Sequence, residues 1–318
     1  MAKSNKNPDP EESKSEPELL PAPLAYLNPE FLNSPDGRLL RILSEYSEPL
    51  SRFRREKIQD TVVFFGSARF ASLPDAQNAL TILEKPGSAK PAPPEQQPGG
   101  KDGDALQAAL KRAHAGVEMA RYYEEARRLA SMLTEWTLTL PGKRHRFVVT
   151  SGGGPGIMEA ANRGAREAGG KTIGLNIRLP FEQYPNQYIT PELNFEFHYF
   201  FMRKYWFAYL AKALVVFPGG FGTLDELFEI LTLAQTHKLA KKILVIVYGK
   251  EYWNRVLNLE ALADAGTISP EDVNGFTMVD TPEEAFEVLK EGLTRYHLQP
   301  QQARPAPEEG PEIAKTLP

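Results

Sequence analysis

Short, almost wholly apolar runs alternate along this chain with longer segments in which apolar residues recur every three or four positions. Strands that are buried on both faces of a sheet have such continuous apolar runs, and amphipathic helices have the three-and-four spacing. The runs typical of strands lie at 61–65, 147–150, 172–177, 214–217 and 243–247, with 195–199 as a further candidate. The alternation predicts an α/β fold built on a mostly parallel sheet with helices on both faces.

The segments with helical spacing lie between these runs, and each pairs with a neighbouring strand as βαβ units require. They are 38–53, 106–138, 157–168, 203–211, 223–237 and 283–296. We expect one domain over residues 34–297.

Three segments rich in proline are expected to lie outside the packed domain. Residues 1–30 hold six prolines and six acidic residues, so we expect a disordered N-terminal tail over 1–33. Residues 85–103 hold five prolines and four glycines and are expected to form an exposed insertion. The last part of the chain, 298–318, holds five prolines and is expected to be a disordered C-terminal tail.

Composition narrows the class of protein. The chain has 318 residues, 42% of them hydrophobic, and no cysteine, which excludes disulfides, a thiolate nucleophile and zinc–thiolate sites. Its net charge of −4 argues against binding of nucleic-acid polymers. No run approaches the roughly 20 apolar residues of a membrane helix, and the acidic N-terminus does not resemble a secretory signal. We therefore expect a cytoplasmic protein that does not bind a membrane.

Two glycine-rich turns follow apolar runs and open helices, one at 152–156 and one at 218–223, and Gly66-Ser67 follows the first strand. The first backbone N–H groups of a helix lack internal partners and favour anions, and glycine lets a phosphate approach them. Neither the dinucleotide fingerprint nor the triphosphate-binding loop is present. These turns therefore predict a binding site for a nucleoside monophosphate.

Thr223 and Glu226 allow two interpretations. Thr-x-x-Glu at a helix start is a capping box, in which Thr223 is the N-cap and Glu226 reaches back to its N–H. Alternatively, Glu226 lies in the first helical turn, stays ionised there, and activates water or stabilises a cationic sugar beside a bound nucleotide. Local sequence alone does not choose between them.

The motifs together resemble the LOG proteins, the cytokinin riboside 5′-monophosphate phosphoribohydrolases, in their longer bacterial branch. Pro218-Gly-Gly-Phe-Gly-Thr-Leu-Asp-Glu226 matches the signature of that family, and Met202-Arg203-Lys204 matches its Arg-Lys pair. The segments 151–161 and 65–69 resemble its other two loops, and 38–46 resembles the additional N-terminal helix of that branch.

The resemblance implies a Rossmann-like doubly wound fold, a homo-oligomer of at least two subunits, and neither metal nor cofactor. It also implies hydrolysis of a nucleoside 5′-monophosphate, either a cytokinin nucleotide or AMP, to free base and ribose 5-phosphate. Matched motif by motif, the catalytic pair is Arg203 and Glu226. The phosphate and ribose loops comprise Gly219, Gly220, Gly222, Thr223, Gly66, Ser67, Gly153 and Gly154, and the candidate base pocket comprises Met158, Glu159 and Met202.

Two other functions compete with nucleotide hydrolysis. Members of this family have carried the label lysine decarboxylase, but that reaction needs an electron sink such as pyridoxal phosphate, and no lysine is singled out to bind one. Lys204 is interpreted as a solvated or phosphate-facing neighbour of Arg203. The rival function is a nucleotide- or cofactor-binding carrier or sensor of the same fold that does no chemistry. The preferred base and the role of the insertion stay open.

Overall fold

The computed structural model describes residues 21–85, 102–180, 184–239 and 241–299. It divides into two compact units, Met1–Ser44 and Glu45–Pro318. Most of the expected tails and insertion, at 1–20, 86–101 and 300–318, therefore lies outside the described residues.

The first unit contains helical structure that the sequence analysis assigned to a disordered tail. A 3₁₀ helix spans Ala25–Leu27 and helix α1 spans Pro29–Asn33, followed by the start of α2, Arg38–Arg55. The Oδ1 atom of Asn28 accepts hydrogen bonds from the backbone N–H groups of Glu30 (3.1 Å) and Phe31 (3.2 Å). Asparagine at the N-cap followed by proline at the first helical position is a strong helix start, which the proline count obscured.

The second unit is built on a parallel sheet whose described strands run in the order β4-β3-β2-β1-β5-β6-β7. The order reverses between β1 and β5, so the predicted doubly wound α/β fold is confirmed. The strands are β1 (Thr61–Phe65), β2 (Val148–Ser151), β3 (Thr172–Ile177), β4 (Asn194–Phe197), β5 (Ala211–Val216), β6 (Leu244–Tyr248) and β7 (Thr277–Val279).

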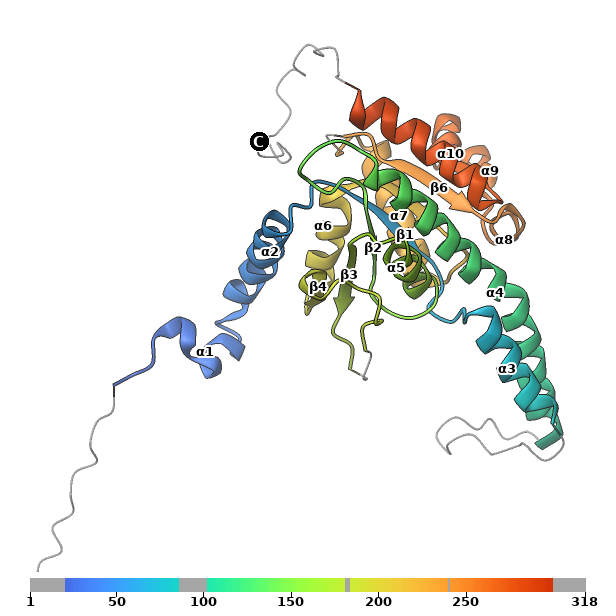
Figure 1. Cartoon of the computed structure of the whole chain (residues 1–318), viewed down its shortest axis with the longest axis horizontal. Helices are drawn as coiled ribbons and strands as arrows, with labels where there is room; N and C mark the ends of the chain where they lie inside the picture. The colour runs from blue at the N-terminus through green and yellow to red at the C-terminus, as the bar shows by residue number, and fades with distance from the viewer. Residues whose placement is uncertain (1–20, 86–101, 181–183, 240, 300–318) are drawn as a thin grey trace, which may run out of the picture. The chain divides into compact units, whose positions relative to one another are not determined.

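Helices cover both faces of this sheet (Figure 1). They are α3 (Leu73–Glu84), α4 (Asp102–Leu138), α5 (Ile157–Glu167), α6 (Phe200–Leu210), α7 (Phe221–Gln235), α8 (Lys250–Val256), α9 (Leu259–Asp264) and α10 (Pro282–Leu293). Two 3₁₀ helices (Pro191–Leu193 and Pro270–Asn274) and a π-helical turn (Thr294–Leu298) complete the described elements. None of the helices in the described ranges is both long and apolar enough to cross a lipid bilayer.

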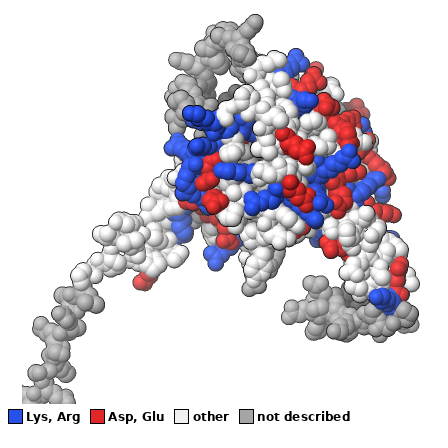
Figure 2. Space-filling view, in the orientation of Figure 1, with Lys and Arg blue, Asp and Glu red and all other residues white. Residues whose placement is uncertain are grey.

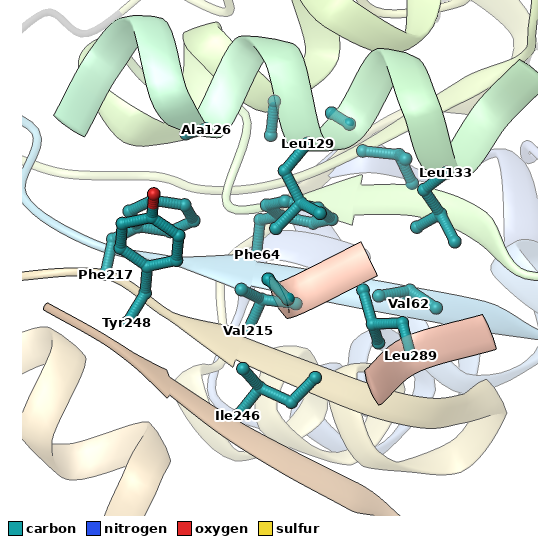
Figure 3. Packing of buried hydrophobic residues seen from close by; sticks show 14 of the residues in the cluster. Val62, Phe64, Ala126, Leu129, Leu133, Val215, Phe217, Ile246, Tyr248 and Leu289 are labelled. Carbon is teal, nitrogen blue, oxygen red and sulfur yellow. The ribbon is translucent and has the colours of Figure 1, made fainter. Parts of the chain in front are cut away.

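One face of the sheet forms the main core with α4, α5 and α10. Alternate strand residues such as Val62, Phe64 and Val215 point to this face and meet Leu133 of α4 and Leu289 of α10 (Figure 3). On the opposite face α6 packs against β1, where the rings of Phe65 and Phe207 lie edge to face with centroids 4.9 Å apart. Because both faces are covered, every residue of the central strand β1 is buried.

The sequence analysis missed α3, α8, α9 and β7. Strand β7 is a three-residue edge strand in which only Val279 is buried, so it leaves no apolar run. Helices α8 and α9 have only seven and six residues, too few for a helical period to stand out. The candidate strand at 195–199 is present as β4, with the alternating burial of an edge strand.

Removing a core side chain from α4 tests this packing. Leu133→Ala is expected to lower the free energy of unfolding by about 2–5 kcal/mol, because the fully buried leucine leaves a cavity. Leu138→Ala on the same helix, where the leucine is 53% exposed, should change it by about 0.5 kcal/mol or less. Urea unfolding of both variants measures the difference, and equal effects would contradict the assigned face of α4.

Candidate active site

The predicted glycine-rich turns meet at the carboxyl ends of three neighbouring strands. The turn after β1 lies between the turns that follow β2 and β5, because these strands are adjacent in the order β2-β1-β5. The backbone N–H of Ser67 donates to the carbonyl of Pro218 (3.0 Å), and the N–H of Ile157 donates to the carbonyl of Ser67 (3.1 Å). The site therefore lies where the strand order reverses, the position at which open α/β sheets bind ligands.

Gly156 and Gly219 are among the glycines in these turns that close contacts require. Gly156 has φ +71°, and a Cβ atom there would lie 2.2 Å from the carbonyl oxygen of Ser67. A Cβ atom on Gly219 would lie 2.1 Å from Oγ1 of Thr223. Gly220 and Gly222 differ, because a Cβ atom at either would meet nothing within 4 Å. These two glycines leave the first amides of α7 open to a ligand rather than serving internal packing.

The start of α7 corrects both interpretations of Thr223 and Glu226. The helix begins at Phe221 with Gly220 as its N-cap, and no side chain caps it. The carbonyl of Gly220 accepts from the N–H groups of Thr223 and Leu224, both at 3.0 Å. Thr223 is therefore the third helical residue, so the capping box is wrong. Glu226 is the sixth helical residue and lies in the second turn, so its placement in the first turn is wrong as well.

The carboxyl group of Glu226 is buried, with 8% of the residue exposed. Burial raises its pKa to about 7, although the positive charges of Lys204 and Arg203 act in the opposite direction. Within the described part of the chain no hydrogen bond to this carboxyl group is found. Desolvation therefore acts against the ionised form that the sequence analysis expected for this carboxyl group. A carboxyl group with a pKa near 7 is suited to proton transfer at neutral pH.

Arg203 is held over the turn that follows β2. Its Nε atom donates to the carbonyl oxygen of Leu175 in β3 (2.8 Å), and its guanidinium lies 5.1 Å from the ring centroid of Phe207. A Cβ atom on Gly152 would lie 2.7 Å from Nη2 of Arg203, so only glycine leaves room for the guanidinium there. Burial lowers the pKa of Arg203 and the charge of Glu226 raises it, but a guanidinium keeps its proton at neutral pH.

Lys204 does not have the solvated or phosphate-facing position that the sequence analysis gave it. Its Nζ atom lies 2.8 Å from Oδ2 of Asp225 and 2.9 Å from Oε2 of Glu229, both on α7. Burial lowers the pKa of Lys204, but these two carboxylates raise it above its usual value overall. Lys204 therefore ties α6 to α7 and contributes positive charge beside Glu226.

The candidate base pocket is only partly assembled. Met202 is buried on α6 next to Arg203 in sequence, and the sulfur of Met158 lies beside Gly152, the residue that Arg203 also approaches. Glu159, in contrast, accepts a hydrogen bond from the hydroxyl of Tyr123 on α4 (2.7 Å). Its carboxylate is engaged with α4, on the other side of the sheet from α6, which corrects its assignment to the pocket.

A buried polar network beneath the turn at 152–156 was missed. The hydroxyl of Ser151 donates to Oδ1 of Asn162 (2.6 Å) and accepts from the N–H of Gly153 (3.0 Å). The amide nitrogen of Asn186 donates to the carbonyls of Gly153 and Gly154, both at 3.1 Å. Asn162 occupies a position of α5 where the helical period requires an apolar residue, and it is fully buried in the structure. A polar residue at an apolar position is the sequence signal that could have indicated this network.

Tyr252 was missed as well. Its hydroxyl donates to the carbonyl oxygen of Gly219 (2.8 Å), which connects α8 to the turn after β5. No sequence signal indicates this contact, because residues 219 and 252 are brought together only by the order of β5 and β6 in the sheet.

Comparison with known proteins gives concordant matches. A family model described as "possible lysine decarboxylase" matches residues 158–289. The cytokinin riboside 5′-monophosphate phosphoribohydrolase LOG3 of Arabidopsis thaliana is 30% identical over 153 residues, which cover 46% of this chain and 68% of LOG3. LOG7 of the same plant is also 30% identical, over 47% of this chain, and the chain spans 64% of the length of LOG7.

Two further matches are a bacterial protein and a solved structure. The cytokinin riboside 5′-monophosphate phosphoribohydrolase of Mycobacterium marinum is 28% identical over 46% of this chain and 77% of its own length. Among solved structures, the molybdenum cofactor carrier protein of Chlamydomonas reinhardtii is 18% identical with a TM-score of 0.38, over 74% of this chain and 99% of that chain.

The raised pKa of Glu226 predicts how stability depends on pH. A carboxyl group with a pKa of about 7 in the folded state, against 4.5 ordinarily, binds its proton more tightly when folded, so stability falls as pH rises through this window. Glu226→Gln removes this dependence. The stability of the variant relative to the parent chain should therefore increase as pH rises from 4.5 to about 7. Above pH 7 the difference in stability should stay constant. Thermal unfolding across this range measures the gain, and a constant difference between the two proteins would refute the assigned pKa.

Proposed function

Because the chain belongs to the LOG family of cytokinin riboside 5′-monophosphate phosphoribohydrolases, we propose that it hydrolyses the N-glycosidic bond of a nucleoside 5′-monophosphate. The products are the free base and ribose 5-phosphate. The observation that carries this proposal is the buried carboxyl group of Glu226, at the end of the sheet where three glycine-containing turns meet. It lies near the charge of Arg203, and no described residue donates a hydrogen bond to it. A protein that only binds nucleotides needs the turns but not this carboxyl group.

The first amides of α7 are proposed to bind the 5′-phosphate. Gly220 and Gly222 are exposed and leave space around the backbone, and the N–H groups of Phe221 and Gly222 belong to the first helical turn, which has no internal acceptor for them. Phosphate binding there supplies energy away from the bond that breaks and orients the ribose toward the second turn of α7.

Glu226 is proposed to act on the water that attacks the sugar. Cleavage of the C1′–N bond builds positive charge on the ribose, and a nearby carboxylate stabilises that charge. As an oxygen–carbon bond forms at C1′, the carboxylate accepts a proton from the water, and the departing base takes up one proton, so that the reaction consumes one water molecule. A pKa of about 7 lets Glu226 both accept and release this proton at neutral pH.

Arg203 is proposed to act electrostatically rather than as an acid. Its guanidinium does not release a proton, but it lies at the turn after β2 and offers donors to the phosphate or to the departing base. Its positive charge also lowers the pKa of Glu226. Arg203 therefore serves two purposes: it binds the substrate and sets the protonation of the carboxyl group.

We further propose that the protein forms at least a dimer. Aromatic side chains are exposed on the two helices that carry the site: Phe200 (55%) and Phe201 (52%) on α6, and Phe221 (94%) and Phe228 (37%) on α7. Apolar side chains gathered in this way favour burial against another protein surface.

Replacing Glu226 by glutamine tests the reaction. Glu226→Gln keeps the shape of the side chain but removes its proton-accepting group, so kcat for AMP is expected to fall about 10²–10⁴-fold. Glu291→Gln is the control, since that carboxylate is exposed on α10 and does not act on Glu226, and it should retain nearly the full rate. Release of free base from AMP, GMP, CMP and isopentenyladenosine monophosphate is followed by chromatography.

Two results would contradict the proposal. If Glu226→Gln keeps the full rate of hydrolysis, the carboxyl group takes no part in the reaction. Binding of these nucleotides by the parent chain without release of any base would favour a carrier or sensor instead.

Replacing Arg203 tests its influence on Glu226. Arg203→Ala is expected to lower kcat/KM about 100-fold, with a raised KM, because one charged partner of the substrate is lost. It should also move the acidic limb of the pH–rate profile to higher pH, because the pKa of Glu226 rises when a neighbouring cation is removed. If the rate falls at every pH but the acidic limb stays at the same pH, Arg203 acts on the substrate alone.

A further inference from the structure

A cavity of about 920 Å³ lies at the edge of the sheet opposite the glycine-containing turns. It is lined by residues at the amino ends of the same central strands: Asp60 before β1, Arg146 before β2 and Lys212 at the start of β5. Strand β1 spans five residues, so roughly 17 Å separates the two edges. The cavity is therefore distinct from the candidate active site, and its volume is typical of small-molecule sites.

The charges that line this cavity are almost all positive. The lining contains one carboxylate, that of Asp60, and six lysine and arginine side chains: Arg54, Lys57, Lys143, Arg144, Arg146 and Lys212. Figure 2 shows Lys and Arg side chains gathered at the upper left of the larger unit, where β1 begins in Figure 1. Since the whole chain has a net charge of −4, this concentration of positive charge is a local feature.

Most of these cations form no ion pair with another described residue. Asp60 is buried, and both of its carboxylate oxygens already have partners. Its Oδ2 atom lies 2.8 Å from Nε of Arg146, and its Oδ1 atom accepts a hydrogen bond from the N–H of Phe147 (2.6 Å). Of the remaining five cations in the lining, none forms an ion pair with a carboxylate among the residues that the structure describes.

A buried polar atom without a partner and two lowered pKa values lie at the same place. The Nε2 atom of His297, a lining residue, is buried and finds no hydrogen-bond partner in the described ranges. Burial, and next the charge of Lys212, lower the pKa of His297 to about 4 and that of Lys241 to about 7. Lys241 donates to the carbonyl of Tyr209, which lines the cavity. A bound anion would relieve this mutual repulsion.

We propose that the cavity binds a small polyanion that carries a chain of two or three phosphates. Lysine and arginine side chains converging from α2, from the loop at 143–146 and from β5 match the distributed negative charge of such a chain. The cations surround a cavity rather than lining an extended groove, so the site fits a small molecule and not a nucleic-acid polymer.

The test is titration calorimetry of the full chain with inorganic tripolyphosphate and with ATP. The double variant R144Q/K212Q removes two unpaired cations from the lining and is expected to raise Kd at least about tenfold for both probes, since each loses a charge-assisted contact. The matched control, K111Q/R112Q, removes two exposed cations of α4 that do not line the cavity, and should bind as the parent chain does.

The two probes separate the sources of the phosphate chain. Tighter binding of ATP assigns the site to a nucleoside polyphosphate, and equal binding assigns it to inorganic polyphosphate; either supports the proposal. No binding of either probe at about 1 mM, or an unchanged Kd in R144Q/K212Q, would overturn it.

Discussion

The removal of the Glu226 carboxyl group from water is the constraint on which the candidate site depends. Burial raises its pKa to about 7, and Lys204 and Arg203 supply the positive charge that keeps it from rising further. Both cations come from α6, and both are held in place by other elements, Lys204 by α7 and Arg203 by β3. The protonation of one side chain is therefore set by the packing of two helices against the sheet.

The same packing explains why the turns are rich in glycine. The guanidinium of Arg203 lies where a side chain on Gly152 would be, and Thr223 lies where a side chain on Gly219 would be. Gly220 and Gly222, in contrast, face open space at the start of α7. Some glycines thus make room for neighbouring side chains, and others leave backbone amides accessible. The proposed phosphate site beside the buried carboxyl group rests on both roles.

The sequence was sufficient to predict the central sheet and to select candidate site residues, but not the environment of those residues. Strands buried on both faces leave apolar runs, whereas the edge strand β7 does not and was missed. Thr223 and Glu226 were selected from their motif, yet their positions in α7 were misjudged because the helix begins two residues before Thr223. The burial of Glu226, the ion pairs of Lys204 and the contact of Glu159 with α4 depend on residues distant in the chain, which local patterns do not report.

A crystal structure of the Glu226→Gln variant soaked with AMP tests the central claim most directly. The account predicts that the 5′-phosphate lies within hydrogen-bonding distance of the N–H groups of Phe221 and Gly222, with C1′ of the ribose facing the side chain at position 226 and the guanidinium of Arg203 in contact with the nucleotide. A nucleotide bound away from the three turns, or bound there with its C1′ facing away from position 226, would contradict it.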